Sequence, residues 1–367
     1  MRTDSIITTT ICLLACSITS SFAASWLECN GDSGKKLRWG GTSTTARINT
    51  TSFPAGSILQ AAQRGVDITN TNPSPFAINR TTETGTVGRG NGQNEIYADS
   101  ISPPGVARMN YHCYWFFGWH YGLDEVDIVL DSTGRSWTTS QAKNANFAYT
   151  GSSLPIDSVI THEAGHYLGL MHVNWEYNVM GDSWRHHHTN GSNAIIYFGE
   201  DASHGARVLY GSQGSAFHDV SAAHWRRTGA DGEYSSHGRV RVRNSADTGT
   251  LSSITIAGEP GYRVTRGSVV RPEFTIENNG KQTENNVTYG LYVSSNDFIS
   301  YGDTRIGGGT FGSIHPADVA TLTLPVTIPN SLVAGQNYWL GIIVDENNDI
   351  SEVSDSNNRA YIPIRVE

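Results

Sequence analysis

The stretch that decides the fold of the first domain is His162-Glu163-Ala164-Gly165-His166-Tyr167-Leu168-Gly169-Leu170-Met171-His172. On a helix, His162 and His166 lie one turn apart, so both imidazoles can reach one ion. Zinc accepts such nitrogens, and Glu163 is placed to take a proton from a water beside them. Gly169 tolerates the backbone conformation that ends a helix, which lets His172 return as a third ligand. A fourth position stays open, as in catalytic zinc sites.

This motif resembles that of the metzincin zinc metallopeptidases, and within them the matrixin-like enzymes. The family carries a Met-turn below the metal, and Asn178-Val179-Met180-Gly181 is its counterpart here, with Met180 as the methionine. The resemblance implies an α+β catalytic domain over residues 24–211, with a mixed sheet and an active-site helix. It implies one catalytic Zn²⁺, a protein or peptide substrate, Glu163 as general base, and the zinc ligands His162, His166 and His172.

The N-terminus is typical of a secretory signal peptide, residues 1–23. Arg2 precedes an apolar run that is too short to span a bilayer, and small residues such as Ala23 follow it. We therefore expect a secreted, extracellular protein without a transmembrane helix. Leu13-Leu14-Ala15-Cys16 loosely resembles a bacterial lipoprotein cleavage box, so the alternative is a chain that is anchored through a lipid on Cys16.

Removal of the signal peptide leaves two cysteines, Cys29 and Cys113. In an exported protein, an even pair is most simply interpreted as one disulfide. The alternative is that Cys29 ligates the zinc and holds the enzyme latent.

The composition indicates two domains and excludes one class of partner. A chain of 367 residues with 38% hydrophobic residues is long enough for two buried cores. Its formal net charge of −9 argues against a nucleic-acid partner, since phosphate binding requires a basic face. Apolar spacing predicts a helix over 54–70 and a helix near 206–210, and residues 126–130 predict a buried strand.

The second half of the chain has a different pattern. Residues 212–256 are polar and rich in Gly and Ser, so we predict a linker. From 257 to 367, short alternating runs are separated by turn residues, which indicates an all-β sandwich that folds by itself. Three segments, 291–296, 335–341 and 344–352, resemble CARDB domains, the cell-adhesion-related Ig-like modules of bacterial exported proteins. The resemblance implies attachment to a cell surface or to extracellular matrix.

An acidic loop in this half is compatible with a structural Ca²⁺, but the ion does not follow from the sequence. The acids are Asp345, Glu346, Asp349, Glu352 and Asp355. The EF-hand pattern requires Gly at its sixth position and a final Glu, where this chain has Ile350 and Ser356. A hairpin turn is therefore the favoured interpretation.

Three further features lie near the zinc motif. Asp182 stands where some metzincins have a tyrosine that reaches the metal, so no fifth ligand is predicted. For Trp184-Arg185-His186-His187-His188, a solvated loop is favoured over a substrate subsite. The aromatic run from Tyr111 to Tyr121 is predicted as buried core or cleft edge rather than as a second metal site.

Two functions compete on this sequence. The main hypothesis is a secreted zinc metalloendopeptidase with Glu163 as general base. The second is a surface adhesion or binding protein whose zinc is structural and not catalytic. Glu163 separates them, because a structural site has no use for a carboxylate beside its ligand.

Overall fold

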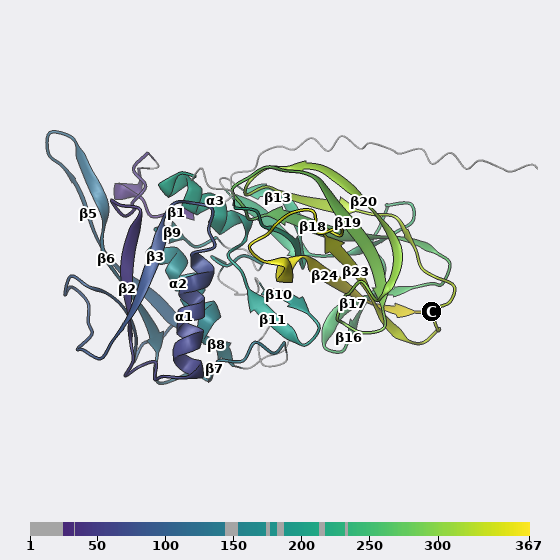
Figure 1. Ribbon diagram of the computed structural model, residues 1–367, viewed down its shortest axis with the longest axis horizontal. Helices are drawn as coiled ribbons and strands as arrows, with labels where there is room; N and C mark the ends of the chain where they lie inside the picture. Colours follow the sequence, from purple (N-terminus) through teal and green to yellow (C-terminus); the bar gives the residue numbers. More distant parts are fainter. Residues whose placement is uncertain are drawn as a thin grey trace, which may run out of the picture.

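The computed structural model describes residues 25–32, 34–143, 153–173, 177–181, 187–212, 217–231 and 234–367. Within these ranges the chain is mostly β structure and has three α-helices, divided between two bodies that lie side by side (Figure 1). None of the described helices is long and apolar enough to cross a membrane. The predicted signal peptide, the alternative lipid site Cys16, Asp182 and residues 184–186 lie outside the described ranges.

A mixed five-stranded sheet forms the centre of the N-terminal body. Its order is β3-β2-β4-β6-β5, and its strands are β2 (Ser43–Asn49), β3 (Ala77–Glu83), β4 (Asn94–Asp99), β5 (Gly105–Trp115) and β6 (Trp119–Asp131). All neighbours pair in parallel except β5, which runs antiparallel to β6 at the edge. The strand predicted at 126–130 is part of β6 and is buried throughout.

Two helices pack on this sheet and against each other, and a third closes the body. They are α1 (Ser57–Thr69), α2 (Ile156–Tyr167) and α3 (Gly199–Tyr210). Helix α1 contacts β2 and β3, whereas α2 contacts β5 and β6, so together they cover one face. Gly65 of α1 permits the close crossing, because a Cβ there would lie 2.7 Å from Ile160 of α2. Helix α1 confirms the helix predicted at 54–70, and the one predicted near 206–210 is the end of α3.

Several short strands lie outside the five-stranded sheet and pair with one another in the N-terminal body. Strand β1 (Ser25–Trp26) pairs with β9 (Leu170–Met171), and β7 (Trp137–Thr138) pairs with β8 (Leu154–Pro155). The hairpin of β10 (His187–Asn190) and β11 (Asn193–Ile196) leads into α3. A 3₁₀ turn, η1 (Cys29–Gly31), follows β1.

The C-terminal body is a sandwich of two sheets, which confirms the predicted β-sandwich. One sheet has the order β16-β17-β24-β23-β19-β20, with β16 (Ser253–Ile256), β17 (Glu259–Val264), β24 (Arg359–Val366), β23 (Asn337–Val344), β19 (Glu284–Ser294) and β20 (Thr304–Ile314). The other is built on β18 (Val269–Asn278), which pairs with β12 (Val220–Ala223), β15 (Val242–Asn244), β21 (Val319–Thr323) and β22 (Val326–Thr327). A second 3₁₀ turn is η2 (Asp355–Asn357). Apolar side chains of both sheets, among them Phe274 and Ile342, fill one core.

The prediction of a linker over residues 212–256 is wrong for the described part of that stretch, which forms β-strands. Strands β12, β15 and β16 belong to the sandwich, and β13 (Trp225–Asp231) and β14 (Tyr234–Arg239) form a hairpin beside it. Few apolar residues produce this result, and the buried ones, Val220, Ala222, Val242 and Ile256, are spread along a polar stretch. A fragment that begins at 257 would therefore lack three strands of its own sandwich.

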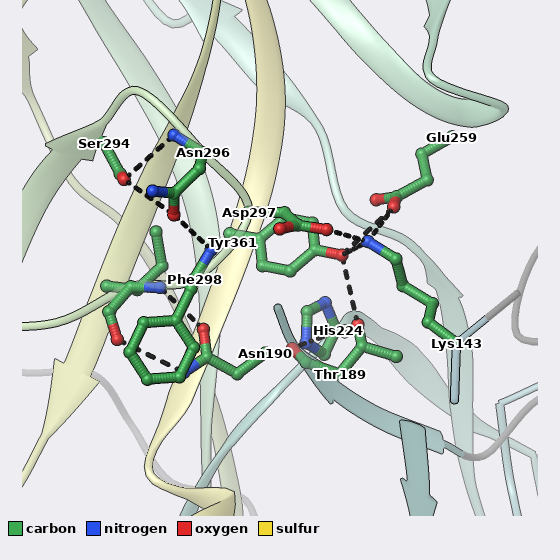
Figure 2. A network of polar contacts seen from close by, with 11 residues as sticks. Lys143, Thr189, Asn190, His224, Glu259, Ser294, Asn296, Asp297, Phe298 and Tyr361 are labelled. Carbon is green, nitrogen blue, oxygen red and sulfur yellow. Dashed lines mark hydrogen bonds and ion pairs between the residues drawn. The ribbon is translucent and has the colours of Figure 1, made fainter. Parts of the chain in front are cut away.

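Polar contacts join the two bodies, as Figure 2 shows. Lys143, which follows β7, reaches Glu259 of the sandwich at 2.5 Å, the Tyr361 hydroxyl at 2.9 Å, and the carboxylate of Asp297. The Tyr361 hydroxyl also lies 3.2 Å from Glu259. Lys143 and Glu259 are largely screened from solvent, so this ion pair is a structural joint rather than a surface contact.

The β10–β11 hairpin forms a second part of the joint. The Asn190 side chain accepts a hydrogen bond from the backbone N–H of Ile299 at 2.7 Å and donates one to its carbonyl at 3.2 Å. The N–H of Gly191 donates to the carbonyl of Asp297 at 2.7 Å. The hairpin between the Met-turn and α3 is therefore held by the C-terminal body.

Candidate metal centre

Helix α2 carries the first two histidines through the core of the N-terminal body. All of its residues are buried, and Pro155 precedes it in an extended conformation. Asp157 lies in the first turn, where a carboxylate favours the positive end of the helix dipole. It also accepts a hydrogen bond from Arg64 of α1 at 3.1 Å, which fixes the start of the helix.

Gly169 turns the chain back toward the helix, as its position in the motif predicts. Its φ of +97° lies in the region that favours glycine, and a Cβ would lie 2.5 Å from the carbonyl oxygen of Leu37. Strand β9 follows at once and pairs with β1. These two constraints bring His172 over the face of α2 that carries His162 and His166.

The three histidines converge on one point. The Nε2 atom of His172 lies 3.0 Å from Nε2 of His162 and 3.0 Å from Nε2 of His166. His162 and His166 are buried, whereas His172 is exposed, so the cluster opens to solvent on one side. The residues that the motif predicted as ligands are thus assembled in one place.

Hydrogen bonds and burial prepare the two helical imidazoles as metal ligands. Nδ1 of His162 lies 2.6 Å from the carbonyl oxygen of Val179, and Nδ1 of His166 lies 2.7 Å from that of Leu170. Each Nδ1–H therefore donates to a carbonyl, which leaves the Nε2 lone pair for an ion. Burial lowers the pKa of His166 to about 4 and that of His162 well below its usual range, with the neighbouring histidines adding to both shifts. Both rings are neutral at neutral pH.

Glu163 lies beside this cluster on the side of β5. Glu163 is only 3% exposed, and burial raises the pKa of its carboxyl group to about 8, although a hydrogen bond from the backbone of Ala107 opposes the shift. Gly105 at the start of β5 leaves room for it, because a Cβ there would lie 2.7 Å from Glu163 Oε1. The carboxyl group is thus held in place between α2 and the edge strand.

Met180 lies under α2, as the Met-turn prediction expects. Its thioether packs on Gly165, where any Cβ would collide with the sulfur. Asn178 shapes the turn, since its side chain accepts a hydrogen bond from the N–H of Met180 at 2.8 Å. Val179, between them, supplies the carbonyl that orients His162. The turn therefore supports both the helix and one candidate ligand.

The predicted disulfide between Cys29 and Cys113 is confirmed, with the two Cα atoms 5.6 Å apart. The alternative in which Cys29 ligates zinc is wrong for this structure, because its sulfur is bonded to Cys113. The bridge ties the segment after β1 to the outer part of β5.

A second polar cluster at the junction of the two bodies was not found from the sequence. Nε2 of His237, on β14, lies 2.9 Å from Glu200 and 3.7 Å from Asp201, both at the start of α3. Its Nδ1 lies 2.8 Å from the carbonyl oxygen of Tyr177, next to the Met-turn. Adjacent acids at a helix start were a visible signal, but His237 lies in the stretch predicted as linker.

Of the prediction for the aromatic run from Tyr111 to Tyr121, buried core or cleft edge, the buried core is wrong. The run forms the end of the β5–β6 hairpin, where Trp115 is 65% exposed and Phe117 is 91% exposed. Its aromatic content is typical of core, but the strands extend beyond the helices that would cover them (Figure 1). Residues 187–188 of the His-rich stretch begin β10.

Comparison with known proteins identifies one part of the chain. The CARDB family matches residues 254–361. This segment is a CARDB domain. The CARDB domain of the PF1109 protein from Pyrococcus furiosus, solved in complex with di-metal ions, is 16% identical with a TM-score of 0.26, and covers 41% of this chain and 90% of its own. The solution structure of that domain is 18% identical with a TM-score of 0.26, and covers 41% and 97%. No match was found among curated proteins.

The CARDB domain is an Ig-like, cell-adhesion-related module, and it begins three residues before the predicted boundary at 257. Of the two functions expected from the sequence, this finding fits a surface or adhesion protein better than a peptidase. The metzincin resemblance of the N-terminal domain, with its peptidase activity and its zinc, stays a prediction.

Proposed function

We propose that the N-terminal domain is a zinc-dependent peptidase and that the CARDB domain attaches it to a surface. The observation that carries the proposal is the convergence of three imidazole Nε2 atoms beside a buried carboxylate that is not itself part of the cluster. A site that only stabilises the fold needs the first feature and not the second.

The donor set fits Zn²⁺. Zinc prefers neutral imidazole nitrogens in tetrahedral sites, and here His162 and His166 are kept neutral and oriented by backbone carbonyls. The exposed His172 would complete three ligands on the solvent side. When bound, the ion supplies Lewis-acid polarisation of a peptide carbonyl and makes a water more acidic.

Glu163 would carry the proton. A water that attacks the peptide carbonyl loses a proton to the carboxylate, and the same proton then passes to the nitrogen of the leaving amine as the C–N bond breaks. Burial alone raises the pKa of Glu163 to about 8, so its ionisation at neutral pH would rely on the nearby cation. The N–H of Ala107 keeps the carboxylate in one orientation.

The second candidate function is adhesion, in a protein whose metal is structural. The CARDB match favours the adhesion part of this candidate. Both candidates require metal binding at His162, His166 and His172, and only the first requires chemistry at Glu163. A measurement of peptidase activity therefore distinguishes the two candidate functions, whereas a measurement of metal content does not.

The test is proteolysis of a casein-type substrate by the purified full chain. The proposal expects cleavage that stops on addition of a chelator and returns with added Zn²⁺. Protein that binds zinc but cleaves neither casein nor a diverse peptide library would contradict the peptidase and support the adhesion protein.

A further inference from the structure

The end of the β5–β6 hairpin presents an exposed aromatic surface, which we call the aromatic arm (residues 111–121). The hairpin extends away from the rest of the N-terminal body in Figure 1. Phe117 at its turn is 91% exposed, and the other exposed rings are Tyr111, Tyr114, Trp115, Phe116, Trp119 and Tyr121. Exposure of so many contiguous apolar groups marks an interaction site rather than an ordinary surface.

The arm is built to hold these rings outward. Strand pairing continues to the turn, with Trp115 opposite Trp119. The disulfide at Cys113 fastens the arm two residues before Trp115. A hairpin stiffened so near its tip cannot fold back to bury its aromatic residues.

Three backbone groups at the turn, the N–H and carbonyl of Phe116 and the carbonyl of Gly118, have partners within the arm. The N–H of Phe116 donates to the carbonyl of Gly118 at 2.8 Å, and Nε2 of His120 lies 3.0 Å from the carbonyl oxygen of Phe116. Unpaired backbone groups are what makes an irregular segment costly to place in hydrocarbon. This tip avoids much of that cost.

The arm carries no formal charge. The sequence has no Asp, Glu, Lys or Arg between Arg108 and Asp124. Among the described residues, Lys35 contacts the arm with its ammonium 4.5 Å from the ring centre of Trp119, and Asp124 contacts it at 2.8 Å from Nδ1 of His112. Attraction to a charged partner therefore does not explain the surface.

We propose that the aromatic arm inserts into the interfacial region of a zwitterionic lipid bilayer. Trp and Tyr favour that region, and Phe at the tip favours the adjoining hydrocarbon. A fluid bilayer accepts a convex apolar tip without a matching groove, which a protein partner would have to supply. A carbohydrate would also stack on the tryptophan and tyrosine rings, but Phe116 and Phe117 at the tip offer it no hydrogen-bonding group, and a bilayer requires none.

The same strand runs from the arm to the candidate metal centre. Gly105 borders Glu163, and ten residues separate it from Trp115. At the rise of a β-strand this distance is roughly 33 Å. The arm would hold the centre about that far from the bilayer, and the inference does not depend on whether the centre is catalytic.

The experiment is co-sedimentation of the full chain with phosphatidylcholine vesicles. We expect binding that changes little between low and high NaCl and does not require anionic lipid. The variant Phe116→Ser/Phe117→Ser should bind at least about tenfold more weakly, since it removes the deepest apolar groups. The matched control Tyr301→Ser alters an aromatic residue that is 55% exposed on the other body, and it should bind like the wild type.

Quenching of tryptophan fluorescence by lipids with brominated acyl chains gives a second measurement on the unaltered chain, and we expect quenching. Absence of sedimentation, equal binding by the double variant, or binding only to anionic vesicles would overturn the proposal. So would a dimer or a polysaccharide complex that forms through the arm while vesicles are ignored.

Discussion

The two bodies of this molecule are characterised by different kinds of evidence: the C-terminal body by its similarity to a known family, and the N-terminal body by the arrangement of its side chains. The C-terminal body contains a CARDB domain, identified by its family. The N-terminal body has no such match, yet it assembles three histidines and a buried glutamate. Among the described residues, both groups of side chains suited to a metal lie in the N-terminal body or at its junction with the other. Family likeness thus identifies the CARDB domain, and geometry identifies the candidate metal centre.

The largest effect should come from removing one histidine. His166→Ala deletes a donor that burial and the Leu170 carbonyl prepare, so zinc content should fall from about one per chain to nearly none. Elemental analysis after dialysis measures it. His315→Ala, an exposed histidine of the C-terminal body, is the control and should change nothing. If His166→Ala keeps its full zinc content, the zinc is not bound at this cluster, and the N-terminal body is not distinguished by a metal centre.

The disulfide should stabilise the N-terminal body only. Cys29→Ser/Cys113→Ser opens a loop with a sequence separation of 84 residues, which should lower the free energy of unfolding by about 3 kcal/mol. Urea unfolding followed by circular dichroism measures the loss. If the sandwich loses as much stability as the N-terminal body, the two bodies unfold as one unit.

Acid should act in opposite directions on two buried groups, one in each body, in metal-free protein. The pKa of His166 is lowered by burial to about 4 from 6.5, so its contribution to stability is present above 6.5 and is lost as pH falls toward 4. The pKa of Asp219, which precedes β12, is raised by burial to about 7 from 3.8, so its contribution is lost as pH rises through 7.

From pH 7 to pH 5.5, His166 should destabilise the N-terminal body and Asp219 should stabilise the sandwich, by roughly 1–2 kcal/mol each. In the N-terminal body, the raised pKa values of Glu163, about 8, and of Asp127, about 7, oppose the loss, because both folded carboxyls gain protons on acidification. Thermal melts at the two pH values, with intrinsic fluorescence and circular dichroism as separate probes, measure the shifts. A sandwich that is no more stable at pH 5.5 than at pH 7 would contradict the assignment of Asp219.

The smallest effect should come from the joint. Tyr361→Phe removes a hydroxyl that contacts Lys143 and Glu259, at a cost of about 1 kcal/mol. Tyr301→Phe, which alters an exposed tyrosine, is the matched control. A larger spread between the unfolding transitions of the two bodies in Tyr361→Phe would show that the joint couples them.

The sequence predicted the candidate centre well because its parts are local. His162, Glu163 and His166 share one helix, and Gly169 must turn the chain for His172 to return. The cysteine pair was equally accessible, since no other pair remained after the predicted signal. Such inferences need only helix geometry and counting.

Predictions from the sequence were wrong or missing where the burial or the contacts of a residue depend on segments that are distant in the chain. Val220 and Val242 are isolated apolar residues in a polar stretch, and only pairing with β18 makes them core. The aromatic arm has the composition of core, but none of the described helices covers that end of the sheet. His237 meets Glu200 only because β14 reaches across the junction.

The most direct test of the central claim is Glu163→Gln, measured for both zinc content and peptide cleavage. The amide keeps the shape of the carboxylate but cannot take the proton of the attacking water. The account predicts about one zinc per chain, as in the wild type, and a peptidase rate lower by at least ~10²-fold. Cleavage by Glu163→Gln at near the wild-type rate would contradict it.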